Sequence, residues 1–88
     1  MNRIDLLLYG AFRSYSDAGT VSVDLPETCT VAMAKELIAQ RLQRLRPDLG
    51  DASLVFDSAL ANEREILSDQ DGILGSSQLA ILPPVCGG

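Results

Sequence analysis

The feature that most limits how this chain can fold is a single stripe of apolar residues at helical spacing, which lies between segments that alternate like strands. The stripe spans residues 31–46, where Thr28 or Thr30 can cap the start and Pro47 ends the helix. The residues expected on its buried face are Val31, Ala34, Leu37, Ile38, Leu42 and Leu45. The residues expected on the opposite, solvated face are Lys35, Gln40, Gln43 and Arg44. A chain of 88 residues has room for one domain, so this helix needs a sheet to cover it.

Several segments on either side of the helix show strand patterns. Residues 4–9 and 21–25 alternate, and we expect them to form a hairpin across the turn that contains Gly10 and the polar stretch 14–19. The run Leu54-Val55-Phe56 predicts a short strand, and residues 59–66 carry a weaker strand signal with a turn at Asn62. Residues 78–82 are apolar on both faces, as in a central strand or one whose second face meets a partner.

The order of hairpin, helix and returning strands predicts an α+β fold. We expect a β-grasp (ubiquitin-like) roll, with a mixed sheet of four to five strands and one main helix packed across it on Leu6, Leu8 and Val23. The last strand is expected to pair in parallel beside the first. The β-grasp domain is expected to span residues 1–82, and residues 83–88 are expected to form an extended, flexible tail.

The tail Pro83-Pro84-Val85-Cys86-Gly87-Gly88 is interpreted as a slim arm. The two prolines fix φ and favour extended geometry, and glycine has no Cβ, so the last two residues fit a narrow channel. An arm that presents the carboxylate of Gly88 suits chemistry done on the chain end by another enzyme. A merely disordered tail is more often polar, whereas this one follows the apolar run 79–82.

Composition excludes several classes of function. The net charge of −5 argues against nucleic acid and anionic membrane surfaces as partners. With no histidine and two isolated cysteines, Cys29 and Cys86, we expect no metal site, no bound cofactor and no side-chain active site. Nothing matches a signal peptide or a membrane span, so the cytoplasm is the expected compartment. The basic residues Arg41, Arg44 and Arg46 are interpreted as a solvated face rather than a docking patch.

The end of the chain resembles the MoaD/ThiS family of ubiquitin-like sulfur carriers, and within it the small subunit of molybdopterin synthase. An apolar strand at 78–82, then Pro-Pro-Val, one variable residue and Gly-Gly, matches the family pattern. Residues 6–13 are similar to the family's first strand and turn, and Ala61-Asn62-Glu63 resembles its mid-chain turn. Two segments depart from the pattern, Ser14 where a glutamate often follows the arginine, and Gly75-Ser76-Ser77-Gln78 where an acidic segment is usual.

The resemblance implies a role for the chain end in sulfur transfer. An E1-like adenylating enzyme would use ATP to activate the carboxylate of Gly88, and a sulfur-donating enzyme would convert it to a thiocarboxylate. That sulfur would build the dithiolene of molybdopterin inside the large subunit of molybdopterin synthase, while Gly87 keeps the tail thin enough to thread. The chain would then be the non-catalytic sulfur-carrier subunit of a two-subunit synthase.

Strand periodicity indicates where such a partner docks. If residues 4, 6 and 8 face the helix, Leu7 and Tyr9 face the far side of the sheet, and the last strand adds either residues 79 and 81 or residues 80 and 82. The expected partner-binding residues are Leu7, Tyr9, Leu79, Ile81, Pro83, Pro84, Val85 and Cys86.

Three other functions stay open at this point. The chain is alternatively a sulfur carrier for thiamine thiazole or cysteine, a ubiquitin-like modifier joined to other proteins through Gly88, or a binding module with an incidental tail. A binding module predicts that truncating the two final glycines changes nothing. Lys35 is the single lysine, which leaves little scope for self-linked chains of modifiers.

Overall fold

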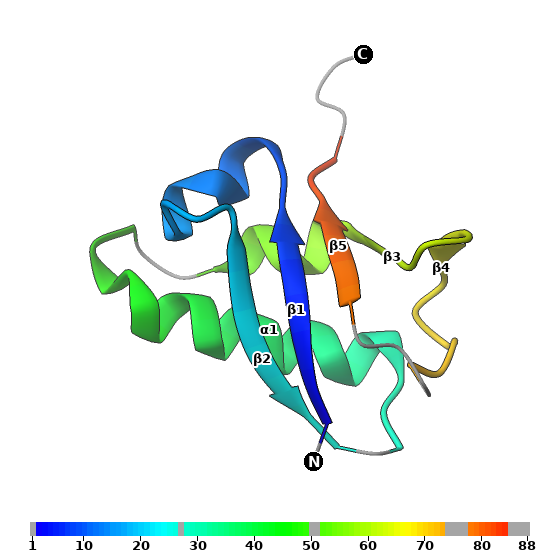
Figure 1. Ribbon diagram of the computed structural model, residues 1–88. Coiled ribbons are helices and arrows are strands. Elements are labelled where there is room, and N and C mark those ends of the chain that lie inside the picture. The colour runs from blue at the N-terminus through cyan, green and yellow to red at the C-terminus, as the bar shows by residue number, and fades with distance from the viewer. Residues whose placement is uncertain (1, 27, 50–51, 74–77, 85–88) are drawn as a thin grey trace.

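Strands from the two ends of the chain pair in parallel at the centre of a five-stranded mixed sheet (Figure 1). They are β1 (Asn2–Leu8) and β5 (Gln78–Leu82). The sheet order is β2-β1-β5-β3-β4, in which β2 (Thr20–Leu25), β3 (Ala59–Ala61) and β4 (Ile66–Leu67) pair antiparallel with their neighbours. The computed structural model describes residues 2–26, 28–49, 52–73 and 78–84.

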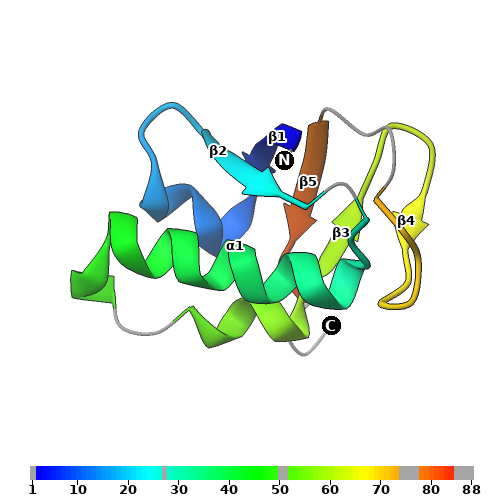
Figure 2. The same ribbon diagram turned by 90° about the horizontal axis from the view of Figure 1, so that it is seen from below.

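One long helix, α1 (Val31–Leu45), crosses a single face of this sheet (Figure 2). Thr30 caps it, because its Oγ accepts a hydrogen bond from the N–H of Met33 at 3.3 Å. The first two N–H groups of the helix, those of Val31 and Ala32, donate to the carbonyls of Asp71 and Asp69 at 2.9 and 3.0 Å. The start of the helix is therefore held by a loop that comes much later in the chain.

The hydrophobic core lies between the sheet and α1. Its fully buried side chains are Ile4, Leu6, Phe12, Leu25, Val31, Ile38, Leu42, Val55, Leu60, Leu79 and Ile81. Alternate residues of β2 point into this core, as the sequence pattern predicted. The predicted hairpin, single long helix, parallel last strand and β-grasp architecture are confirmed.

The predicted strand at Leu54-Val55-Phe56 is wrong, because these residues form a 3₁₀-helix, η3 (Ser53–Asp57), that packs on α1. Only Val55 reaches the core, while Leu54 and Phe56 stay exposed. The Ser58 hydroxyl donates to the Leu54 carbonyl at 2.7 Å and closes the turn. Two further 3₁₀-helices occur in the described chain, η1 (Gly10–Tyr15) after β1 and η2 (Pro47–Leu49) after α1.

Two predictions about the faces of α1 are also wrong. Leu45 was expected in the core but is 38% exposed, because the end of the helix extends past the edge strand β2 (Figure 1). Lys35 was expected in solvent but is buried, and its Nζ lies 2.8 Å from Oδ1 of Asp69. Lys35 follows Val31 by four residues and precedes Leu42 by seven, so helical spacing puts it on the buried face.

We predict that Leu42→Ala and Leu45→Ala differ sharply in their effect on stability. Both replace leucine by alanine in one helix, but Leu42 is fully buried and Leu45 is not. Leu42→Ala should lower the free energy of unfolding by about 2–5 kcal/mol, and Leu45→Ala by roughly 1 kcal/mol or less. Urea denaturation of both variants measures the difference. Equal losses would contradict the placement of the core.

Candidate functional site

The root of the tail is held against the turn that follows β1. Because β1 and β5 are parallel, their C-terminal ends lie at the same end of the sheet, where Pro83 and Pro84 follow β5. An ideal Cβ at Gly10 would lie 2.7 Å from Cγ of Pro83, and Gly10 has a φ of +57°. Only glycine therefore allows this close approach with this backbone conformation. Val85, Cys86, Gly87 and Gly88, on which the predicted chemistry depends, lie outside the described residues.

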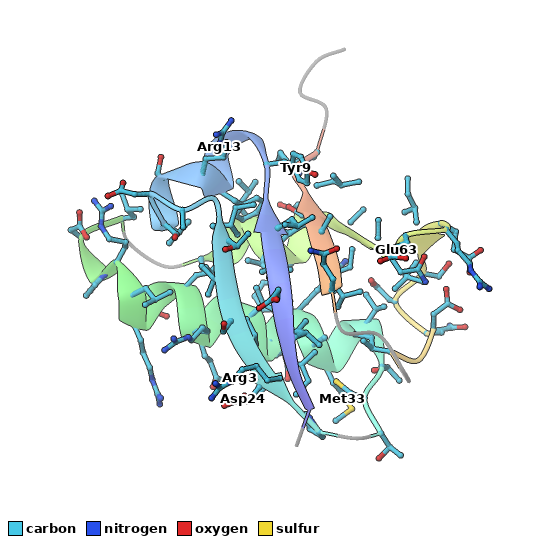
Figure 3. The ribbon with its side chains drawn as sticks, viewed as in Figure 1. Arg3, Tyr9, Arg13, Asp24, Met33 and Glu63 are labelled. Atoms are coloured by element: carbon cyan, nitrogen blue, oxygen red, sulfur yellow. The ribbon has the colours of Figure 1, made fainter. Side chains whose placement is uncertain are left out.

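An apolar surface covers the side of the sheet that faces away from α1. Strand register aligns Leu7, Ala80, Ala61 and Ile66 in one row across four strands. A second row joins Leu82 to Ala59. Ile66 is 65% exposed, and Tyr9, at the end of β1, is 47% exposed (Figure 3). We call these residues the outer apolar face: Leu7, Tyr9, Ala59, Ala61, Ile66, Ala80 and Leu82.

The rest of the outer surface of the sheet is polar. Register pairs Arg3 with Asp24 and Asp5 with Ser22 across β1 and β2. The first pair forms an exposed ion pair at 3.3 Å, and in the second the Ser22 hydroxyl donates to the Asp5 carboxylate at 3.5 Å. The apolar surface is thus confined to the half of the sheet that carries the root of the tail.

A shallow hollow of about 160 Å³ lies within the outer apolar face. Leu7, Ala61 and Ala80 form its apolar floor, Asn62 and Gln78 also line it, and Tyr9 and Glu63 lie at its two sides (Figure 3). Alanine at two positions keeps this surface low, so a protruding apolar side chain of a partner has room to enter. Exposed apolar surface of this kind makes the outer apolar face the candidate docking surface for a partner protein.

The structure corrects two of the predicted partner-binding residues. Leu79 and Ile81 are 1% and 0% exposed, because their parallel register beside Leu6 and Leu8 directs all four side chains into the core. The other pair considered from the sequence, Ala80 and Leu82, occupies the outer face instead. Leu7 is half-buried and Tyr9 is exposed on the outer face, Pro83 is half-buried against Gly10, and Pro84 is exposed beyond it.

The cysteine and acidic side chains of the described residues form no reactive or metal-binding cluster. The only cysteine among them, Cys29, is buried, and burial raises the pKa of its thiol, so it acts as a small apolar residue. No cluster of three or more acidic or cysteine side chains suitable for a metal ion occurs in the described parts of the chain. Across the same residues, no helix has the length and apolar character needed to span a membrane.

The order of the strands, the parallel central pair and the single covering helix define a ubiquitin-like, β-grasp protein. The amino-acid sequence matches no protein-family model and no curated protein. The likeness to known proteins is therefore found by comparing its three-dimensional structure with solved structures.

Solved structures with this fold include proteins from two archaea. SAMP1 from Haloferax volcanii is 22% identical, with a TM-score of 0.69 over 99% of this chain and 100% of the other. A second structure, of the H. volcanii small archaeal modifier protein 1, is also 22% identical, with a TM-score of 0.67 over 97% and 100%. A Pyrococcus furiosus protein provisionally described as molybdopterin converting factor, subunit 1, is 17% identical, with a TM-score of 0.68 over 97% and 100%. At these identities the likeness shows the fold.

We predict that Gly10→Ala is more damaging than Gly19→Ala. Both glycines have positive φ, +57° and +77°, so alanine should cost about 1–2 kcal/mol at either position. At Gly19 no atom lies within 4 Å of the added Cβ, whereas at Gly10 the Cβ would collide with Pro83. The collision should cost roughly 1–3 kcal/mol more.

A double-mutant cycle identifies the source of that extra cost. Pro83→Ala removes the ring that the new Cβ meets, so it should rescue much of the loss in Gly10→Ala and none of the loss in Gly19→Ala. Thermal or urea unfolding of the three single and two double variants, beside the native chain, gives the coupling energies. Equal costs at the two glycines, or no rescue, would refute the contact at the tail root.

Proposed function

We propose that this chain is a sulfur-carrier protein of the molybdopterin synthase type, in which Gly88 carries the sulfur. The observation that supports this most strongly is the sequence Pro-Pro-Val-Cys-Gly-Gly, which directly follows the central strand of a β-grasp sheet. The fold is shared with a protein provisionally described as a molybdopterin converting factor subunit. The apolar face beside the tail root supplies a surface for a large partner.

The proposed chemistry requires that Gly88 bear the free α-carboxylate. A carboxylate oxygen attacks the α-phosphorus of ATP on an activating enzyme, which forms an acyl-adenylate and releases pyrophosphate. A sulfide equivalent from a sulfur-donating enzyme then attacks the carbonyl carbon, and AMP leaves. The product is a thiocarboxylate, whose sulfur is a better nucleophile than the original oxygen. The partner enzymes supply the acid–base groups, and the expected compartment is the cytoplasm.

The outer apolar face is the proposed contact with the large synthase subunit. A partner seated on this face lies beside Pro83. The six residues from Pro83 onward would then pass from the end of β5 into the active site of the partner. Gly87 then keeps the chain narrow enough for the channel, and Val85 and Cys86 contact the partner before it. The protein would act as the non-catalytic subunit, delivering a covalently held sulfur atom.

A second candidate function is protein modification, in which activated Gly88 is transferred to an amine of another protein. The observation that favours it is the likeness to small archaeal modifier proteins. Both functions share the activated terminus and differ in what attacks it, sulfur or nitrogen. A carrier for thiamine thiazole or cysteine would share the whole mechanism up to the acceptor.

We predict that sulfuration consumes the chain end alone. Incubation with an E1-like enzyme, ATP and a sulfur source should raise the intact mass by one exchange of oxygen for sulfur. Deleting Gly88, or extending the chain beyond it, should abolish this gain and leave the unfolding midpoint unchanged, because the last core side chain among the described residues is Ile81, seven positions earlier. Gly87→Val should also abolish sulfur transfer, because the valine side chain is too wide for the channel that admits glycine. Cys86→Ser should keep most sulfur transfer.

The alternative functions give different products in the same reaction. A modifier should become attached through Gly88 to amines of other proteins, which intact mass and gel analysis detect. A binding module should show no change at the terminus in any variant. Sulfuration of a C-terminally extended, unprocessed chain at the native rate would overturn the carrier mechanism.

We predict that Leu7→Asp weakens binding to the large synthase subunit. The new carboxylate lies on the outer apolar face and lines its hollow, where docking would bury it without a partner. Affinity should fall about tenfold or more.

Thr20→Asp is the matched control, since Thr20 pairs with Leu7 in register but is an exposed residue of the edge strand. Calorimetry with both variants, after their folding is checked by circular dichroism, tests the surface. Equal affinities would exclude this face.

A further inference from the structure

The strand β2 forms one edge of the sheet, and within the described chain it pairs with β1 alone. The N–H of Leu8 donates to the carbonyl of Gly19 at 2.9 Å, and antiparallel pairs alternate between bonded and non-bonded positions. The backbone groups of Thr20, Ser22 and Asp24 therefore point away from β1. Such an edge is a template for another strand.

A groove of about 530 Å³ runs between this edge and α1. Its apolar lining comes from Val23, which is buried, and Leu37, which is half-buried. The ion pair of Arg3 and Asp24 also lines it (Figure 3). An extended peptide added to β2 would place alternate side chains over this apolar lining.

The groove is basic in a protein that is acidic. Three arginines, Arg3, Arg41 and Arg44, line it against the single carboxylate of Asp24. The chain as a whole carries a net charge of −5. The charge of the groove is thus opposite to that of the molecule, which favours a segment with carboxylate side chains over a basic one. It also disfavours a second copy of this chain, whose matching edge would bring the same arginines together.

Arg41 occupies the edge in the free protein. Its Nε donates to the carbonyl of Ser22 at 3.2 Å, so it satisfies one of the outward backbone acceptors. A backbone N–H of an added strand can replace it at that oxygen. The guanidinium would then be released to pair with a carboxylate of the same peptide.

We propose that the groove between β2 and α1 binds an extended acidic segment of a partner protein, which adds a strand to β2 and pairs its carboxylates with Arg41 and Arg44. This surface is separate from the outer apolar face and from the tail root. It offers a docking point for a protein that handles the carrier while the terminus is engaged elsewhere. The sulfur-carrier function does not depend on it.

A synthetic peptide with three glutamates on either side of Val-Ile-Val tests the proposal. It should bind the full chain and shift the NMR amide signals of Thr20, Ser22 and Asp24, with affinity falling as salt is added. The same peptide with lysines in place of glutamates should not bind, and proline in place of the central isoleucine should weaken binding because it removes a backbone donor.

Charge-neutral variants identify the side chains responsible. Arg41→Gln and Arg44→Gln should each weaken binding roughly two- to fivefold, as for exposed ion pairs. Arg64→Gln removes the same charge from the exposed turn between β3 and β4 and should have no effect. The proposal is overturned if the glutamate peptide does not bind, if the lysine peptide binds as well, or if Arg64→Gln weakens binding equally. Shifts confined to the outer apolar face would overturn it too.

Discussion

The parallel pairing of β1 with β5 is the interaction on which the rest of the structure depends. It joins strands from the two ends of the chain and brings Leu6, Leu8, Leu79 and Ile81 together in the core. A contact this distant in sequence forms only when the intervening helix and strands allow it, so it carries a large loop-closure cost. The burial of four large side chains between the sheet and α1 offsets that cost. The same pairing determines which residues remain outside.

Local periodicity is enough to predict the hairpin, α1 and the last strand. In each, apolar residues recur at the spacing of a strand, two residues, or of a helix, 3.6 residues. It is not enough where both faces of an element are apolar. In residues 78–82 the polar Gln78 and the small Ala80 share a face with the apolar Leu82, so the pattern is ambiguous, and the register with β1 places Leu79 and Ile81 inside. The three-residue run at Leu54 is likewise too short to carry a period, so its 3₁₀ conformation was missed.

The candidate site was predictable to a similar degree. The tail motif and the positions of Leu7 and Tyr9 follow from the sequence alone. The contact between Gly10 and Pro83 does not, because it joins residues at opposite ends of the chain through tertiary structure. The same limit applies to Arg41, whose bond to the Ser22 carbonyl appears only once α1 lies beside the edge of the sheet.

The burial of Lys35 has a consequence for the proposed chemistry. An acyl-adenylate reacts with any unprotonated amine it meets, so a carrier with a free lysine risks attacking its own activated terminus or that of a neighbouring copy. Here the one ε-amino group in the sequence is buried beneath the loop at Asp69, and its Nζ lies 2.8 Å from Oδ1 of that carboxylate. The fold thereby keeps the only side-chain amine of the sequence away from the activated acyl group. Self-acylation at a side-chain amine is prevented by the same ion pair that fastens the loop to the helix.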